Sequence, residues 1–122
     1  MPQNIPAKVW IENGNACLEN GNMLAVMEEC GKISFYYKGR KILEEMPELT
    51  FNSGYRNYEN KGSNLWKIRV SFEADEKEAF YGLGHERINC FNKKGCTVDL
   101  CHVNTKTSIP YVYSSLGYGF IW

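Results

Sequence analysis

The chain has 122 residues, and its 14 Lys and Arg residues balance its 14 Asp and Glu residues, so the formal net charge is zero. Without a basic excess or a basic block, nothing draws the chain to nucleic-acid phosphates or to anionic lipid. The N-terminus has no basic cluster, and the longest strongly apolar run, Met23–Met27, is too short to span a bilayer. These features predict one soluble, cytoplasmic domain.

Short segments that alternate apolar and polar residues fill the first part of the chain, as half-buried strands do. Pairs such as Asn13-Gly14 and Lys38-Gly39 separate them, and these residues supply the positive φ that tight hairpin turns require. The pattern therefore predicts a meander of antiparallel strands. The predicted strands are Lys8–Glu12, 16–18, Met23–Met27, Ile33–Tyr37 and 41–43.

The middle of the chain divides into a polar stretch and one clear strand. Residues 47–64 lack a long strand pattern and are predicted to form a surface connection. In residues 66–72 the apolar side chains of Trp66, Ile68, Val70 and Phe72 alternate with polar ones, which predicts a strand with one face on a core. Residues 73–78 are expected to make one helical turn at most.

The last third of the chain is rich in paired glycines. Gly82 and Gly84 flank one apolar residue, which suits a chain that reverses sharply or lets another backbone come close. After Pro110 the apolar residues alternate along a predicted strand, where core packing is favoured over a platform for sugar rings. These alternating residues are Leu116, Tyr118, Phe120 and Trp122. Many short strands with regular turns predict an antiparallel β-sandwich.

Five cysteines make an odd count in a chain without an export signal, which favours reduced thiols over a disulfide framework. The grouping of Cys90, Cys96, Cys101 and His102 raises the question of zinc. Its gaps are longer than those of zinc knuckles, and free cysteine commonly behaves as a small buried hydrophobe. We therefore expect no metal and no cofactor.

Several motifs resemble one enzyme family in their order and spacing. They are Phe80-Tyr81-Gly82-Leu83-Gly84, Lys94-Gly95, Asn104-Thr105, Ile109-Pro110 and Gly117-Tyr118-Gly119. Together they resemble the N-terminal domain of glycoside hydrolase family 31, the α-glucosidases and α-xylosidases, over about residues 79 to 122.

The resemblance implies a β-sandwich of the galactose-mutarotase-like kind, packed against a (β/α)8 barrel that carries the chemistry. Residues 1–122 would form a single N-terminal domain, incomplete at its end, with few or no helices. The barrel motif Trp-x-Asp-Met-Asn-Glu is absent from this sequence, so no catalytic residue is assigned and the chain alone is expected to be inactive. Its expected partners are the barrel of the same parent polypeptide and an α-glycoside substrate.

The family pattern points to one substrate-contacting segment. In relatives a loop at this position reaches over the barrel mouth, where Asp or Asn followed by Thr contacts the sugar on the leaving-group side. The matching residues here are Asn104 and Thr105. An asparagine amide can donate to and accept from sugar hydroxyls without burying a charge. An equally weighted reading has the same pair closing a turn through side-chain to backbone hydrogen bonds.

Three further expectations follow. A free-standing carbohydrate-binding sandwich is the alternative to the glycosidase domain. A mutarotase-type acid/base pair of His85 and His102 is disfavoured, because a shared fold alone does not carry a function. If the chain is truncated, exposed strand edges and apolar surface predict self-association.

Overall fold

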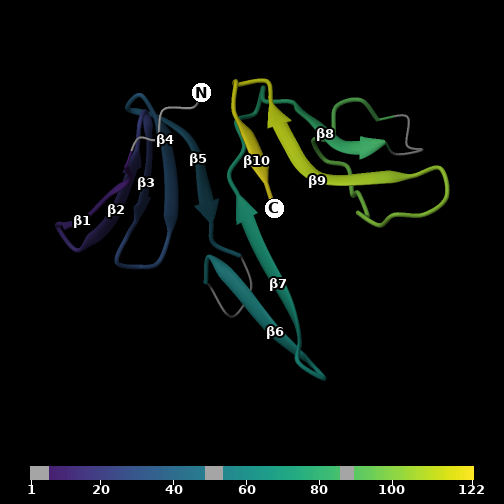
Figure 1. Cartoon of the computed structure of the whole chain (residues 1–122), viewed down its shortest axis with the longest axis horizontal. Coiled ribbons are helices and arrows are strands. Elements are labelled where there is room, and N and C mark those ends of the chain that lie inside the picture. The colour runs from purple at the N-terminus through teal and green to yellow at the C-terminus, as the bar shows by residue number, and fades with distance from the viewer. Residues whose placement is uncertain (1–5, 49–53, 86–89) are drawn as a thin grey trace. The chain divides into compact units, whose positions relative to one another are not determined.

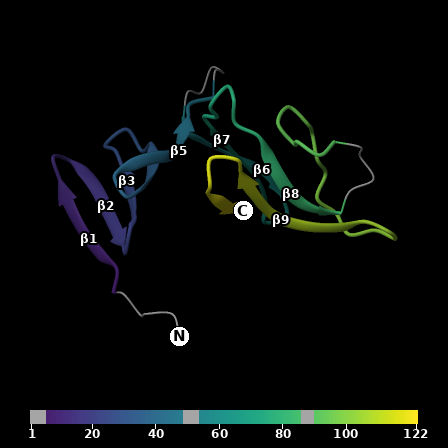
Figure 2. The same cartoon turned by 90° about the horizontal axis from the view of Figure 1, so that it is seen from above.

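The computed structural model describes residues 6–48, 54–85 and 90–122, and the chain divides into two compact units, Met1–Ala74 and Asp75–Trp122 (Figures 1 and 2). Among the described residues every regular element is a strand, so none of them forms a helix that could cross a membrane. The predicted all-β, antiparallel class is confirmed.

The first unit is a seven-stranded antiparallel sheet whose strands lie in the order β1-β2-β3-β4-β5-β7-β6. Its first five strands follow one another as a meander, as predicted. The strands are β1 (Lys8–Glu12), β2 (Asn15–Asn20), β3 (Met23–Met27), β4 (Ile33–Tyr37), β5 (Arg40–Met46), β6 (Arg56–Gly62) and β7 (Leu65–Phe72).

Two-residue turns join β1 to β2 and β4 to β5. Asn13 and Gly14 have φ values of 51° and 81°, and Lys38 and Gly39 have values of 49° and 76°. Two consecutive positive φ angles match the type I′ geometry that suits the twist of a hairpin. The sequence signals for these turns therefore identified the right residues.

The hairpin of β6 and β7 corrects two expectations. Strand β6 lies inside the stretch that was predicted to be a surface connection, of which residues 49–53 fall outside the described part. Trp66 and Ile68, expected in the core, are 58% and 50% exposed. The cause is the short pairing of β5 with β7, which involves only the last residues of β7, so that among the described strands only β6 pairs with the rest of β7 (Figure 1).

The second unit is a three-stranded antiparallel sheet in the order β10-β9-β8, formed by β8 (Phe80–His85), β9 (Thr107–Ser114) and β10 (Gly119–Ile121). The strand predicted to begin at Leu116 is shorter than expected. Leu116 lies in the turn between β9 and β10, which the hydrogen bond from Gly117 N to Ser114 O closes at 3.0 Å. The aromatic side chains of Phe72, Tyr118 and Phe120 are half-buried.

An irregularity in the β8–β9 ladder explains the paired glycines. The register passes from Gly82↔Val112 directly to Gly84↔Ser108, so three residues of β9, among them Pro110, lie opposite Leu83. A Cβ on Gly84 would overlap the carbonyl oxygen of Thr107, because the two backbones come too close for a side chain. The predicted close approach of another backbone is thus confirmed. Pro110 has no N–H to donate, and the bulge is where a strand tolerates that loss.

Polar residues dominate the buried positions that the structure describes. Cys17 is the one buried hydrophobic residue among them, whereas five buried residues are polar: Ser34, Glu45, Glu78, Ser108 and Ser114. Hydrogen bonds must compensate such burial, and ion pairing must compensate the buried charge.

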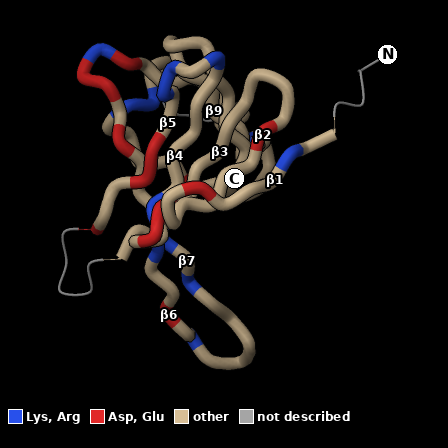
Figure 3. The backbone as a smooth tube through the Cα atoms, turned by 90° about the vertical axis from the view of Figure 1, so that its left-hand side faces the viewer, with Lys and Arg blue, Asp and Glu red and all other residues tan. Residues whose placement is uncertain are grey.

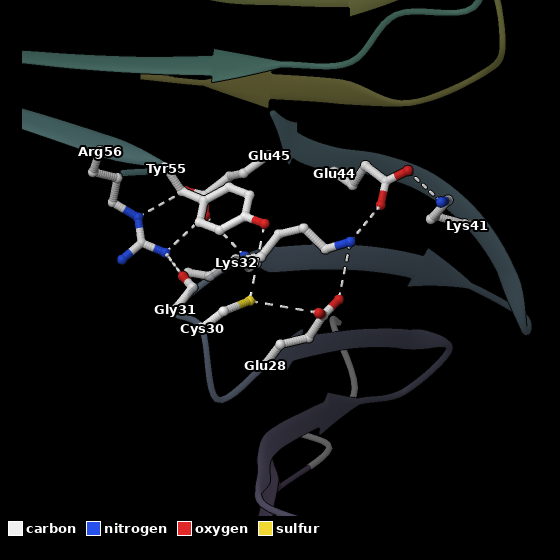
Figure 4. A network of polar contacts seen from close by, with 10 residues as sticks. Glu28, Cys30, Gly31, Lys32, Lys41, Glu44, Glu45, Tyr55 and Arg56 are labelled. Atoms are coloured by element: carbon white, nitrogen blue, oxygen red, sulfur yellow. Dashed lines mark hydrogen bonds and ion pairs between the residues drawn. The ribbon is translucent and has the colours of Figure 1, made fainter. Parts of the chain in front are cut away.

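Glu45 shows this compensation in the first unit (Figure 4). Its carboxylate is 5% exposed and accepts two hydrogen bonds of 2.7 Å from the Arg56 guanidinium, one at each oxygen. It also accepts a bond of 2.8 Å from the backbone N–H of Ile33, and Arg56 donates to the carbonyl of Gly31 at 2.6 Å. This bidentate pair ties the start of β6 to β4 and β5.

We predict that Gly84→Ala destabilises the chain by about 3 kcal/mol or more, since the methyl group adds a backbone clash to an unfavourable φ of +89°. Gly95→Ala is the matched control, because its φ is +75° and a Cβ there would meet nothing within 4 Å. That variant should lose roughly 1 to 2 kcal/mol. Urea denaturation measures both. Equal losses would contradict the close approach.

We also predict that Glu45→Gln lowers the free energy of unfolding by about 2 to 3 kcal/mol, because it leaves a half-buried guanidinium without its anion. Lys61→Ala, which removes the exposed pair of Lys61 with Glu59, should cost about 0.5 kcal/mol or less. Thermal and urea unfolding followed by circular dichroism compare the two variants. A Glu45→Gln effect as small as that of Lys61→Ala would show that the pair is not structural.

Candidate functional site

The predicted substrate-contacting residues lie together at the tip of a turn. Val103 and Lys106 form an isolated bridge, and Lys106 N donates to Val103 O at 2.9 Å. Asn104 and Thr105 occupy the two central positions of this turn, and both are exposed. The turn therefore closes through a backbone bond and presents both side-chain positions at its tip.

The base of this turn is tied down on both sides. The Ser108 hydroxyl is buried and donates to the carbonyl of Cys101 at 3.0 Å, while Ser108 also pairs with Gly84 across the β8–β9 ladder. On the other side, the Lys106 ammonium donates to the carbonyl of Asp99. The turn precedes β9 directly, at the end of the strand far from β10 (Figure 1). Its position thus depends on the glycine-dependent contact described above.

Thr105 adopts an unusual backbone conformation, with φ at +68°. A β-branched residue rarely takes a positive φ, and it does so only where the surrounding structure imposes it. Here the flanking bridge and the anchored base impose it. Strain of this kind collects at binding sites and in tight turns.

Glu78 is the most buried acid that the structure describes, at 3% exposure. One of its oxygens accepts hydrogen bonds from the Ser114 hydroxyl and, at 2.6 Å, from the Tyr118 hydroxyl. The other accepts a bond of 3.1 Å from the backbone N–H of Asp75. Burial, followed by the bond to Glu78, raises the pKa of the Tyr118 hydroxyl. Both oxygens are engaged, and they link the turn of Glu78 to Ser114 and Tyr118. Its place in a polar run gave no sequence signal for burial.

In the first unit Glu28 and Glu44 are instead held by ion pairs with lysines (Figure 4). Lys32 lies 3.0 Å from Glu28 and 3.2 Å from Glu44, and these two bonds raise its pKa. Lys41 also contacts Glu44 and is the main cause of the lowered pKa of that carboxyl. The carboxylates of this network are held by cations rather than opposed across an open cavity.

A shallow hollow lies on one face of the β6–β7 hairpin. Its lining comes from two cross-strand pairs, Asn57 with Arg69 and Glu59 with Lys67. The cavity volume is about 110 Å³, whereas small-molecule pockets usually measure roughly 300 to 1,000 Å³. The hollow is thus too small to enclose a sugar ring. Basic residues outnumber acidic ones along the hairpin, whereas both kinds occur on the other strands of the first unit (Figure 3).

The cysteines correct one expectation. Cys90 and Cys96 form a disulfide, whereas all five thiols were expected to be reduced, and Cys17, Cys30 and Cys101 are free. Among the described residues no group of three or more His, Cys, Asp and Glu side chains could hold a metal ion. His85 ends β8 and His102 lies in the loop before the turn, both exposed.

Known proteins that are similar to this chain match it over nearly its whole length. No protein-family model matches it. A curated relative from Pseudescherichia vulneris, described as an uncharacterized family 31 glucosidase, is 29% identical over 140 aligned residues, which cover 99% of this chain and 26% of the relative.

Two solved structures have the same fold. A family 31 α-xylosidase from a soil metagenome, crystallised with xylose, is 32% identical with a TM-score of 0.86, covering 100% of this chain and 20% of that one. The α-xylosidase of Xanthomonas citri is 26% identical with a TM-score of 0.79, covering 96% and 13%. This similarity confirms the predicted antiparallel β-sandwich class.

The chain spans about a quarter of the curated relative and a fifth or less of the two solved chains. The resemblance that the motifs indicated is thereby confirmed: in sequence and in fold, this chain is similar to a part of these family 31 glucosidase and α-xylosidase chains.

Proposed function

We propose that this chain is the N-terminal, non-catalytic domain of a cytoplasmic α-glycosidase that hydrolyses terminal α-glucosides or α-xylosides. Residues 1–122 would form one domain that buttresses a (β/α)8 catalytic barrel in the same polypeptide. The observation that carries the proposal is the match of nearly the whole chain to a small share of glucosidase and xylosidase chains.

The hydrogen bonds and ion pairs of the two buried acids favour a non-catalytic role for this chain. Glycoside hydrolysis needs two carboxyl groups about 5 to 9.5 Å apart across the scissile bond. Glu45 is neutralised by Arg56, and both oxygens of Glu78 already accept hydrogen bonds. Neither acid is available for proton transfer or for nucleophilic attack, so the proposal assigns the catalytic carboxylates to the barrel.

The turn at Asn104 and Thr105 would complete one edge of the sugar pocket. Because Lys106 N and Val103 O close the turn through the backbone, the Asn104 amide is not required for closure. It can then offer a donor and an acceptor to hydroxyls of the leaving-group sugar. The anchored base would hold the turn in place as substrates enter and products leave.

The first test is turnover of nitrophenyl α-glucoside and α-xyloside. The 122-residue chain should show no hydrolysis above background, whereas a longer polypeptide read from the same gene should hydrolyse at least one of them. Hydrolysis by the 122-residue chain itself would refute the assignment.

The second test is Asn104→Ala in the longer enzyme. Loss of one or two hydrogen bonds to the leaving-group sugar should change the ratio of kcat/KM between disaccharide substrates by roughly two- to tenfold. The glycone remains bound as before, so hydrolysis of nitrophenyl substrates should change little.

Asn22→Ala, at an exposed turn of the first unit, is the matched control. It should leave both the kcat/KM ratio between disaccharides and the hydrolysis of nitrophenyl substrates unaltered. The melting temperature decides between the two readings of Asn104. A fall of several degrees with an unchanged substrate ratio would mean that the amide serves only the turn.

A further inference from the structure

Strand β1 forms one edge of the seven-stranded sheet, and its outer side has no neighbouring strand among the described residues. Its apolar residues Val9 and Ile11 are 72% and 79% exposed, the second of them among the most exposed large hydrophobic residues described. An edge that combines open backbone groups with apolar side chains is a template for another strand. The remaining question is which strand fits it.

The sequence of β1, Lys-Val-Trp-Ile-Glu, is complementary to its own reverse. If a second β1 lies antiparallel with Trp10 opposite Trp10, then Lys8 faces Glu12, and Val9 faces Ile11. Because the arrangement is two-fold symmetric, the Lys8–Glu12 pair and the Val9–Ile11 pair each occur twice. We propose that two copies of this chain associate through β1 in this register, with Trp10 on the two-fold axis.

The backbone geometry permits the same register. Asn13 and Gly14 form a two-residue turn, so Glu12 and Asn15 flank it as a hydrogen-bonded pair. Hydrogen-bonded and non-bonded pairs alternate along an antiparallel ladder, which directs the N–H and C=O groups of Val9 and Ile11 toward the open edge. In the proposed register these residues face each other and exchange four hydrogen bonds across the interface.

The side chains also agree with a pairing about Trp10. A non-bonded pair brings the opposing Cα atoms to about 4.5 Å, and aromatic pairs at such positions stabilise a sheet. Lys8 Nζ lies 3.6 Å from Glu19, and Trp10 Nε1 donates to Glu12 at 3.3 Å. Both contacts are exposed, so the Lys8 and Glu12 charges remain accessible to a second copy.

The opposite face of β1 would gain an extended apolar surface. Val9 pairs with Leu18, and Ile11 pairs with Ala16, which in turn pairs with Met27. Leu18 and Met27 are 45% and 43% exposed. Joining two sheets at β1 would make this surface continuous, with Val9 of one copy against Ile11 of the other.

The other edge of the sheet, β6, suits self-pairing less well. A register irregularity between Asn60 and Gly62 interrupts its ladder with β7. Bulges of this kind blunt an edge against further pairing. The β6 edge therefore serves as the control.

The test is the Kd of self-association of the 122-residue chain by sedimentation equilibrium. Lys8→Glu and Glu12→Lys each replace two attractions by two repulsions and should raise the Kd about tenfold. The double variant Lys8→Glu/Glu12→Lys restores complementarity and should return the Kd to near that of the unchanged chain. Lys61→Glu, on β6, should have little effect.

Cysteine cross-linking tests the register itself. Trp10→Cys places two thiols opposite each other across the axis, so oxidation should yield a covalent dimer beyond the level of the unchanged chain. Ile11→Cys should not, because Ile11 faces Val9 of the other copy. Monomers at all concentrations, a dimer insensitive to both charge changes, or equal cross-linking of the two variants would overturn the proposal. These readouts involve no glycosidase activity, so they succeed or fail independently of the proposed function.

Discussion

Backbone pairing between strands that are neighbours in the sequence is the interaction on which both units of this chain depend. Every strand described pairs with the strand before or after it in the sequence, and one further pairing, of β5 with β7, skips β6. Such local pairing needs little loop closure, so it can form in each unit by itself. Apolar side chains contribute less than in a usual domain, because most large hydrophobic residues described keep an exposed face.

The buried polar groups take over part of the role of a core. Glu45 joins β4, β5 and β6 through Ile33 and Arg56, and Glu78 joins its own loop to Ser114 and Tyr118. Each of these acids accepts hydrogen bonds from several donors. These bonds offset the desolvation cost of burying the carboxyl group and fix its geometry. The same saturation removes both acids from chemistry.

Much of the fold was predictable because alternation and turn residues are local signals. The strands Lys8–Glu12, Met23–Met27 and Ile33–Tyr37 were predicted with their observed bounds. Strand β6 was missed because its residues are polar on an exposed hairpin, and Trp66 was misplaced because alternation cannot tell a covered face from an open one. The disulfide of Cys90 with Cys96 depends on a loop path that spacing does not reveal.

The turn of Asn104 and Thr105 came from the resemblance, and its backbone closure and its anchoring through Ser108 came from the structure. Neither the backbone closure of the turn nor its anchoring could be predicted from the amino-acid composition. Gly84, by contrast, carried a sequence signal whose physical reason is now clear: the carbonyl of Thr107 occupies the space of a side chain.

The central claim is that the catalytic carboxylates lie in a longer polypeptide of which this chain is the supporting sandwich. Sequencing the source gene beyond the codon of Trp122 tests it most directly. The account predicts an open reading frame that continues for several hundred residues and encodes the barrel motif Trp-x-Asp-Met-Asn-Glu. A stop codon directly after Trp122 would contradict it and would favour a free-standing carbohydrate-binding module.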